Sequence, residues 1–102
     1  MARLTDAERA TLSTRLPHWS MVAGRDAIER RFEFRDFSEA WGFMNRVALL
    51  AESQNHHPDW SNSYDTVVID IVNHAAGGVT QRCIELAIDV EAIRREMTDP
   101  PL

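Results

Sequence analysis

Three of the four histidines fall in segments without a regular hydrophobic pattern, and their side chains are the best candidates for chemistry. His56 and His57 are adjacent and precede Pro58, whereas His74 follows a β-branched run and precedes a pair of glycines a few residues on. Histidine changes its charge near neutral pH and is the commonest general acid or base. Loops and strand ends on a rigid scaffold are the usual place for such side chains. The histidines therefore define a candidate site.

Their spacing leaves three interpretations open. The histidines can be polar loop residues that cap a helix and a strand end. They also have the number of ligands for a catalytic zinc ion, but no HxH or HExxH pair places two of them on one face of an element. In the third interpretation they perform acid–base catalysis without a metal, and Glu52 or Asp59 orients a ring.

The first third of the chain predicts a helix followed by a hairpin. A capping-box pattern that starts at Thr5 and a proline at position 17 predict a helix over residues 6–15. Apolar residues then alternate over 19–23 and over 28–34, with turn residues between the two runs. Arg30 interrupts the alternation, because it falls on the apolar face of the second run. We expect an antiparallel hairpin with one mainly apolar face.

The middle of the chain predicts a long amphipathic helix. Asp36 and Glu39 have the spacing of a helix cap, and the apolar rhythm ends near Glu52. Pro58 disfavours helix in the residue before it, so the histidine segment should be extended. The expected apolar stripe consists of Phe37, Ala40, Trp41, Met44, Val47, Ala48 and Ala51.

The last third predicts a second hairpin, a loop and a closing helix. Strands are expected at 60–64 and 66–72, a glycine-containing loop at 74–79, and a helix at about 81–97 that Thr80 caps. The apolar band of this helix is too wide to face only a sheet, which predicts burial against a second subunit. The band consists of Cys83, Ile84, Leu86, Ala87, Ile88, Val90, Ile93 and Met97.

The predicted order is α-β-β-α-β-β-α in one domain, residues 1–102. Hairpins pair their strands antiparallel, so the economical packing is an α+β two-layer sandwich: a four-stranded antiparallel sheet with three helices on one face. A chain of 102 residues can bury one modest core of this kind.

The composition excludes several functions. The chain has no lysine and a net charge of −5, which argues against direct nucleic-acid binding, because that affinity depends mainly on neutralised phosphates. No apolar run approaches the roughly 20 residues that span a bilayer, and the N-terminus is charged where a signal peptide is apolar. Together with a single cysteine, these features predict a cytoplasmic protein that binds no membrane.

The histidine segment resembles the signature of the pterin-4a-carbinolamine dehydratases. The signature consists of ESQNHHP at residues 52–58, then Tyr64 after five residues and His74 after nine more. The segments GRDAIERRFEFRDFSEAWGFMNRVALLAE, HAAGGVT and ELAIDVEAI also resemble this family, in its hairpin and central helix, its last loop and its closing helix. The resemblance extends over about residues 3–97, so it covers nearly the whole chain.

The resemblance implies an activity. In this family a 4a-hydroxytetrahydropterin loses water to give a quinonoid dihydropterin, as in tetrahydrobiopterin recycling, and no metal or organic cofactor takes part. By resemblance His56, His57 and His74 surround the pterin. We expect His56 and His74 to be the acid–base pair and His57 to be mainly a binding residue.

The resemblance also assigns supporting residues. Glu52 should orient or charge His56, while Trp60 and Tyr64 should line or support the site unless they are simply core aromatics. One departure concerns Cys83, which stands where the family often has an aspartate. If that aspartate orients a catalytic histidine, activity would be reduced here, unless Asp89 replaces it.

Two other functions fit the same resemblance. Members of the family also serve as dimerisation partners of a transcription factor, a use that depends on an oligomer surface rather than on histidines. The same pterin site could also serve molybdopterin metabolism. A homodimer or homotetramer is expected in each case.

Overall fold

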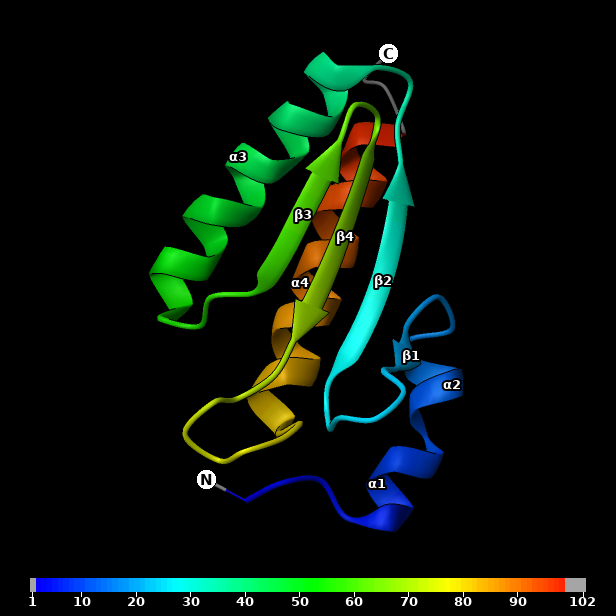
Figure 1. Ribbon diagram of the computed structural model, residues 1–102, viewed down its shortest axis with the longest axis vertical. Coiled ribbons are helices and arrows are strands. Elements are labelled where there is room, and N and C mark those ends of the chain that lie inside the picture. Colours follow the sequence, from blue (N-terminus) through cyan, green and yellow to red (C-terminus); the bar gives the residue numbers. More distant parts are fainter. Residues whose placement is uncertain (1, 99–102) are drawn as a thin grey trace.

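The computed structural model describes residues 2–98 and contains a four-stranded antiparallel sheet (Figure 1). The strands follow the order β1-β2-β4-β3, so the two hairpins meet where β2 pairs with β4. Alternate residues of β4 are fully buried, as the β-branched pattern predicts. The strands are β1 (Ser20–Met21), β2 (Ile28–Glu33), β3 (Asp59–Ser63) and β4 (Thr66–Ile71).

Helices cover one face of this sheet. The long helices α3 and α4 contact each other, and α4 runs behind the strands in the view of Figure 1. Of the two short N-terminal helices, α2 lies beside β1, and α1 lies at the lower end of the molecule in Figure 1. The result is the expected two-layer α+β sandwich. The helices are α1 (Asp6–Ala10), α2 (Leu12–Arg15), α3 (Phe37–Gln54) and α4 (Gln81–Thr98).

Local signals place the helix ends correctly. Thr5 and Glu8 form the expected capping box, and the Asp36 side chain accepts a hydrogen bond from the Glu39 N–H group. The first predicted helix is nevertheless divided, because Thr11 separates α1 from α2. Strand β1 is also shorter than predicted, and Met21 is largely exposed.

The face of α3 that packs on the sheet differs from the predicted stripe. Phe37 and Trp41 are 48% and 51% exposed, whereas Phe43, which was not in the stripe, is fully buried. The Phe43 ring centroid lies 4.8 Å from that of Phe32 and 4.9 Å from that of Phe34. Contact with these two aromatic rings stabilises Phe43 in the core. The side of α3 that faces the sheet is therefore rotated about the helix axis relative to the prediction.

The apolar band of α4 is buried mainly within the chain itself. Five of its members are fully buried in the core, and Ile93 and Met97 pack against that core. Leu4, Leu16 and Trp19 of the N-terminal segment belong to the same core, so burial of these band residues does not by itself require a second subunit. Ile88 is an exception, since it is 40% exposed. The five buried members are Cys83, Ile84, Leu86, Ala87 and Val90.

Arg30 lies on the helix-facing side of β2 because α4 supplies it with a partner. Its guanidinium forms an ion pair with Glu91, and both side chains are only 16% exposed. The same guanidinium lies 4.3 Å from the Phe32 ring centroid, in cation–π geometry. Burial of this charge is therefore compensated.

The N-terminal segment and the loop before α4 are packed together. The Leu4 N–H group donates to the Val79 carbonyl at 2.8 Å, and Arg9 forms two hydrogen bonds with Asp26 at 2.6 and 3.0 Å. The hydrogen bonds from Arg9 hold the pKa of Asp26 below its ordinary value. Gly78 is required here, because a Cβ atom at this position would lie 2.0 Å from an Asp26 carboxylate oxygen.

Candidate active site

A cavity of about 310 Å³ contains all three histidines of the predicted site. The end of α3, the end of β4 and the first turn of α4 meet at this point, which is the lower end of the molecule in Figure 1. Three segments that are separate in the sequence thus bring their polar side chains together. The cavity is lined by Asn55, His56, His57, Val72, Asn73, His74, Ala75 and Arg82.

The end of α3 directs the two adjacent histidines to different sides. Asn55 adopts the left-handed conformation, with φ 50° and ψ 44°, which ends the helix. The N–H group of His56 then bonds back to the Ala51 carbonyl at 3.0 Å. As a result His56 is 9% exposed, whereas the His57 side chain is 56% exposed.

His56 is held by a backbone carbonyl and a thiol. Its Nε2 atom lies 3.2 Å from the Val72 carbonyl oxygen and 3.8 Å from the Cys83 Sγ atom. A carbonyl oxygen only accepts hydrogen bonds, so the hydrogen of the neutral ring belongs on Nε2. This contact leaves Nδ1 as the nitrogen of the neutral ring that can accept a proton.

Glu52 contacts His57 and not His56. The Glu52 Oε1 atom lies 2.5 Å from the His57 Nε2 atom, and both side chains are exposed. The expectation that Glu52 orients His56 is therefore wrong, because the turn at Asn55 points His56 into the protein and leaves His57 beside the last turns of α3. The carboxylate accepts from the His57 ring, which fixes the orientation of that ring.

His74 is also paired with a carboxylate. Its Nε2 atom lies 3.4 Å from the Asp59 Oδ2 atom at the start of β3, and its side chain is 72% exposed. The loop that carries it is closed by Asn73, whose carbonyl accepts from the Gly77 N–H group at 2.9 Å. Gly77 has φ +71°, a conformation that glycine adopts without strain. The three histidines thus share one cavity but have three different partners.

Sequence reasoning missed the three other polar residues of the cavity. Asn55 and Asn73 shape the two loops, and Arg82 donates a hydrogen bond to the Gln54 carbonyl at the end of α3. Arg82 also gives the cavity a permanent positive charge. The sequence contained one signal for Arg82: it follows the predicted cap at Thr80 by two residues, which places it in the first turn of the last helix, next to the loop that carries His74.

The two aromatic residues of the predicted site do not line the cavity. Trp60 points to the helix-covered face of the sheet and packs against the core. Tyr64 lies at the turn between β3 and β4, with φ 51°, and is 64% exposed. Tyr64 is five positions beyond Asp59 along strand β3, a distance of roughly 17 Å. Tyr64 is therefore too far away to line the cavity of its own chain.

Among the described residues, Asp89 forms no hydrogen bond or ion pair with any of the three histidines, so it does not take the role that the resemblance gives to an aspartate at position 83. Its Oδ2 atom accepts a hydrogen bond from the Gln54 side chain at 2.7 Å and so connects the end of α3 to α4.

Within residues 2–98, no group of three or more histidine, cysteine or acidic side chains is arranged to hold a metal ion.

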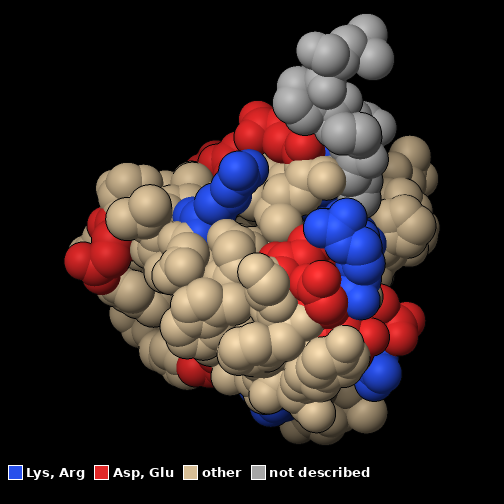
Figure 2. Space-filling view, turned by 90° about the horizontal axis from the view of Figure 1, so that it is seen from above, with Lys and Arg blue, Asp and Glu red and all other residues tan. Residues whose placement is uncertain are grey.

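The surface and the helices give two further constraints. On the end of the molecule that Figure 2 shows, arginines and carboxylates lie next to one another, and most of the visible surface is uncharged. That face therefore offers no continuous basic area to a nucleic acid. In the part of the chain that is described, no helix is long and apolar enough to cross a membrane.

The fold and the histidine cavity match one family of proteins. Residues 2–93 match the profile of the family described as pterin 4 alpha carbinolamine dehydratase. A Nitrobacter winogradskyi protein provisionally named pterin-4-alpha-carbinolamine dehydratase is 55% identical over 94 residues, which are 92% of this chain and 93% of that protein. A Burkholderia multivorans protein with the same provisional name is 52% identical over 91 residues, 89% of each chain. The chain belongs to the pterin-4a-carbinolamine dehydratase family.

Solved structures agree with this assignment. A crystal structure from Brucella melitensis, titled as a transcriptional coactivator/pterin dehydratase, superposes with a TM-score of 0.85 at 44% identity and covers 89% of this chain and 97% of its own. A pterin dehydratase-like protein described as a RuBisCO assembly factor of the alpha-carboxysome has a TM-score of 0.66 at 19% identity, over 78% of this chain and 92% of its own. The second similarity shows only the shared fold.

Proposed function

We propose that this protein dehydrates a 4a-hydroxytetrahydropterin to the quinonoid dihydropterin by metal-free histidine catalysis. The observation that carries the proposal is the meeting of His56, His57 and His74 in one cavity of about 310 Å³, which is of the size that small-molecule sites have. Membership of the family supplies the pterin as the substrate class.

The reaction needs one acid and one base. The bond between C4a and the hydroxyl oxygen breaks, and an acid must protonate the departing oxygen so that it leaves as water. The C4a–N5 double bond forms as N5 loses its proton, and a base must accept that proton. Two histidines in different protonation states perform both steps, and each step of this kind contributes about 100-fold to 10,000-fold in rate.

The contacts suggest how the roles are divided. His56 donates from Nε2 to Val72, so its Nδ1 atom is the base that takes the N5 proton. His74 is exposed and can recover a proton from solvent after each turnover, which suits the acid. His57, oriented by Glu52, then holds the pterin, and Arg82 provides further hydrogen-bond donors to the acceptor atoms of the ring.

A stopped-flow assay tests this function. The 4a-hydroxytetrahydropterin is generated in place, and formation of the quinonoid product is followed by absorbance with and without the protein. We expect acceleration that survives thorough chelation. Loss of activity on chelation and recovery with zinc would contradict the metal-free mechanism, and no acceleration at all would contradict the function. Tetrahydrobiopterin recycling and a cytoplasmic location remain predictions.

Exposed aromatic residues favour a second function, as a homo-oligomeric binding module. Phe37 and Trp41 stack on each other at 6.1 Å on the outer side of α3, and Leu49 on the same helix is 74% exposed. Exposed apolar surface of this kind marks interfaces. The expected dimer or tetramer therefore forms through α3 in this proposal, and not through α4 as the apolar band had indicated. A co-regulator role would use the same surface.

A further inference from the structure

Asp59 lies on the open face of the sheet, beside the histidine cavity but outside its lining. It is the first residue of β3, and the next residue, Trp60, packs against the core, so the Asp59 side chain points to the opposite face. On that face Asp59 lies opposite Asp70 of β4, which in turn lies opposite Glu29 of β2. Three carboxyl groups thus form a row across three strands, and one end of this row reaches the histidine site.

The carboxyl groups of this row have different partners. Asp70 forms an ion pair with Arg25, in the connection between β1 and β2. Glu29 shares a hydrogen bond with Asp70, which raises the pKa of Glu29 above its ordinary value. Asp59, at the end of the row, lies against His74 instead, with its Oδ2 atom 3.4 Å from the Nε2 atom of the ring. The carboxylate next to the cavity is therefore the one whose partner is a histidine of the candidate site.

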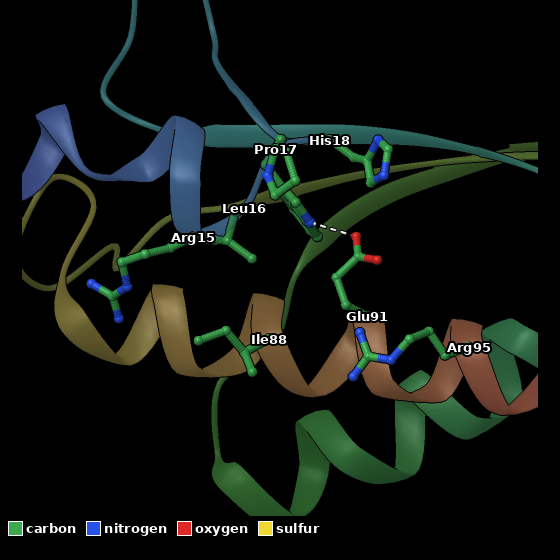
Figure 3. A pocket seen from close by; sticks show the side chains of 8 residues that line it. Arg15, Leu16, Pro17, His18, Ile88, Glu91 and Arg95 are labelled. Atoms are coloured by element: carbon green, nitrogen blue, oxygen red, sulfur yellow. Dashed lines mark hydrogen bonds between the residues drawn. The ribbon is translucent and has the colours of Figure 1, made fainter.

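Glu91 is an example of a carboxylate with a packing role in this chain. It accepts a hydrogen bond from the Trp19 indole at 2.8 Å (Figure 3) and forms an ion pair with Arg30, and its side chain is only 16% exposed. The Asp59 side chain, by contrast, is 55% exposed. An exposed pair contributes little to the free energy of unfolding. The contact between Asp59 and His74 therefore affects the orientation of the ring more than the stability of the fold.

The Nε2 atom is the bonded nitrogen in all three histidines of the cavity. It lies beside the Val72 carbonyl oxygen in His56 and beside a carboxylate oxygen in the other two rings. Carbonyl and carboxylate oxygens only accept hydrogen bonds, so Nε2 carries a hydrogen in each ring. The Nδ1 atoms are then the ring nitrogens that are available to a substrate.

We propose that Asp59 is the positioning residue of His74: its carboxylate accepts a hydrogen bond from Nε2–H and so directs Nδ1 of the acid toward the substrate. This inference rests on the proposed function. In the acid step the protonated ring gives its Nδ1 hydrogen to the departing oxygen, and the electron pair of the C4a–O bond leaves with the water. The N5 proton goes to His56, and the electron pair of the N5–H bond forms the C4a–N5 double bond.

The contact with Asp59 is kept through the whole cycle. After the transfer the His74 ring is neutral and its hydrogen is on Nε2, still bonded to the carboxylate. Solvent then returns a proton to Nδ1, because the side chain is 72% exposed. The ring needs no rotation between turnovers.

Kinetics of two Asp59 variants test this role. Asp59→Ala removes the acceptor and should lower kcat about ten-fold with KM within about two-fold, because the acid is misdirected while the other groups of the cavity stay in place. Asp59→Asn keeps an amide oxygen that can accept from Nε2–H, so its kcat should stay within about three-fold of the wild type. A normal kcat for Asp59→Ala, or an Asp59→Asn variant as slow as Asp59→Ala, would overturn the proposal.

Glu33→Ala is the matched control. Glu33 is also an exposed carboxylate on the open face, with a side chain that is 70% exposed, but it lies opposite Thr66 at the far end of β2. Its removal should change neither kcat nor KM, and thermal unfolding shows whether each variant is folded. If Glu33→Ala were as slow as Asp59→Ala, the effect would come from any lost charge on this face, and the proposal would be overturned.

A measurement that needs no turnover separates this inference from the proposed function. Long-range ¹H–¹⁵N correlation spectra of the histidine rings at about pH 9, where imidazole is neutral, report which nitrogen carries the hydrogen. For His74 we expect a single tautomer with the hydrogen on Nε2, and loss of this pattern in Asp59→Ala. An unchanged ring spectrum in Asp59→Ala would overturn the inference even in an active dehydratase, whereas a wild-type protein without activity would contradict the function itself.

Discussion

The Sγ atom of Cys83 lies 3.8 Å from the Nε2 atom of His56, inside the protein. Cys83 is in the first turn of α4, and its sulfur also accepts a hydrogen bond from the Thr80 N–H group at 3.4 Å. The thiol therefore occupies the position of the N3 side chain in a capping box. It also contacts the ring of His56, the histidine that we propose as the base. At the position where the family resemblance leads us to expect an aspartate, the thiol thus contacts both the Thr80 N–H group and the His56 ring.

The first prediction concerns this thiol. Carbinolamine dehydration needs no covalent intermediate, so Cys83→Ser should keep turnover within about three-fold. Cys83→Asp should hold or raise turnover, because a carboxylate at this position accepts from Thr80 and favours the helix N-terminus by about 0.3–1 kcal/mol. Steady-state kinetics measure both variants. If Cys83→Ser and selective alkylation of the thiol both abolished turnover, the thiol would be catalytic and the proposed mechanism wrong.

The second prediction separates the histidines. His56→Ala and His74→Ala should each lower kcat by at least about 100-fold, whereas His57→Ala should mainly raise KM. His56→Ala should also lower the free energy of unfolding by about 1 kcal/mol, since it removes the hydrogen bond to the partly buried Val72 carbonyl. His74 is exposed, so its variant should unfold like the wild type. Near-normal turnover of a His56/His74 double variant would remove both from the mechanism.

The third prediction concerns a pair of carboxyl groups on the open face of the sheet. Glu29 of β2 lies directly opposite Asp70 of β4, and the hydrogen bond between their side chains raises the pKa of Glu29 above its ordinary value of 4.5. The folded protein therefore binds a proton here at higher pH than the unfolded chain. Its stability increases as the pH falls through the raised pKa towards 4.5, and this contribution is absent at neutral pH.

Replacement of Glu29 by glutamine should consequently stabilise the protein at pH 7. The expected gain is a few tenths of a kcal/mol, ~0.5 at most, because the pair is partly exposed and screened. Urea unfolding at pH 7 and at pH 4 measures it, and the gain should vanish at the lower pH. Glu33→Gln, on the same face of β2 but opposite Thr66, is the control and should show no such pH dependence.

The fourth prediction contrasts two glycines. Gly78→Ala should destabilise the protein by about 1–3 kcal/mol, because the new Cβ atom would collide with Asp26. Gly42→Ala, within α3, meets no atom within 4 Å and should stabilise it by about 0.5–1 kcal/mol. Thermal unfolding compares the two. A neutral Gly78 variant would show that the loop before α4 packs more loosely than the structure indicates.

The fifth prediction concerns assembly. If α3 forms the subunit interface, Trp41→Glu should convert the oligomer to monomers at micromolar concentration, because a charge would be buried against the partner copy. Ile88→Glu on α4 should leave the assembly unchanged. Sedimentation velocity distinguishes these results. A wild-type protein that is monomeric at micromolar concentration would contradict the expected dimer or tetramer.

Local features of this chain could be predicted from the sequence because they depend on neighbours. The cap of α1 at Thr5, the cap of α3 at Asp36 and the β-branched strand that becomes β4 rest on contacts within a few residues. The order of elements followed from these features, and with it the class of fold. The histidine segment could be identified for the same reason, because its residues are close in sequence.

Contacts between distant segments were decided only by the tertiary structure. Which side of α3 is buried depends on the aromatic rings of Phe32 and Phe34, so Phe43 took the place expected for Trp41. The partner of His56 is 27 residues away on another helix, and Arg30 became acceptable on the apolar face only because α4 places Glu91 opposite it. Such pairs arise when separate elements pack, and periodicity within one element carries no information about the side chains that another element will present.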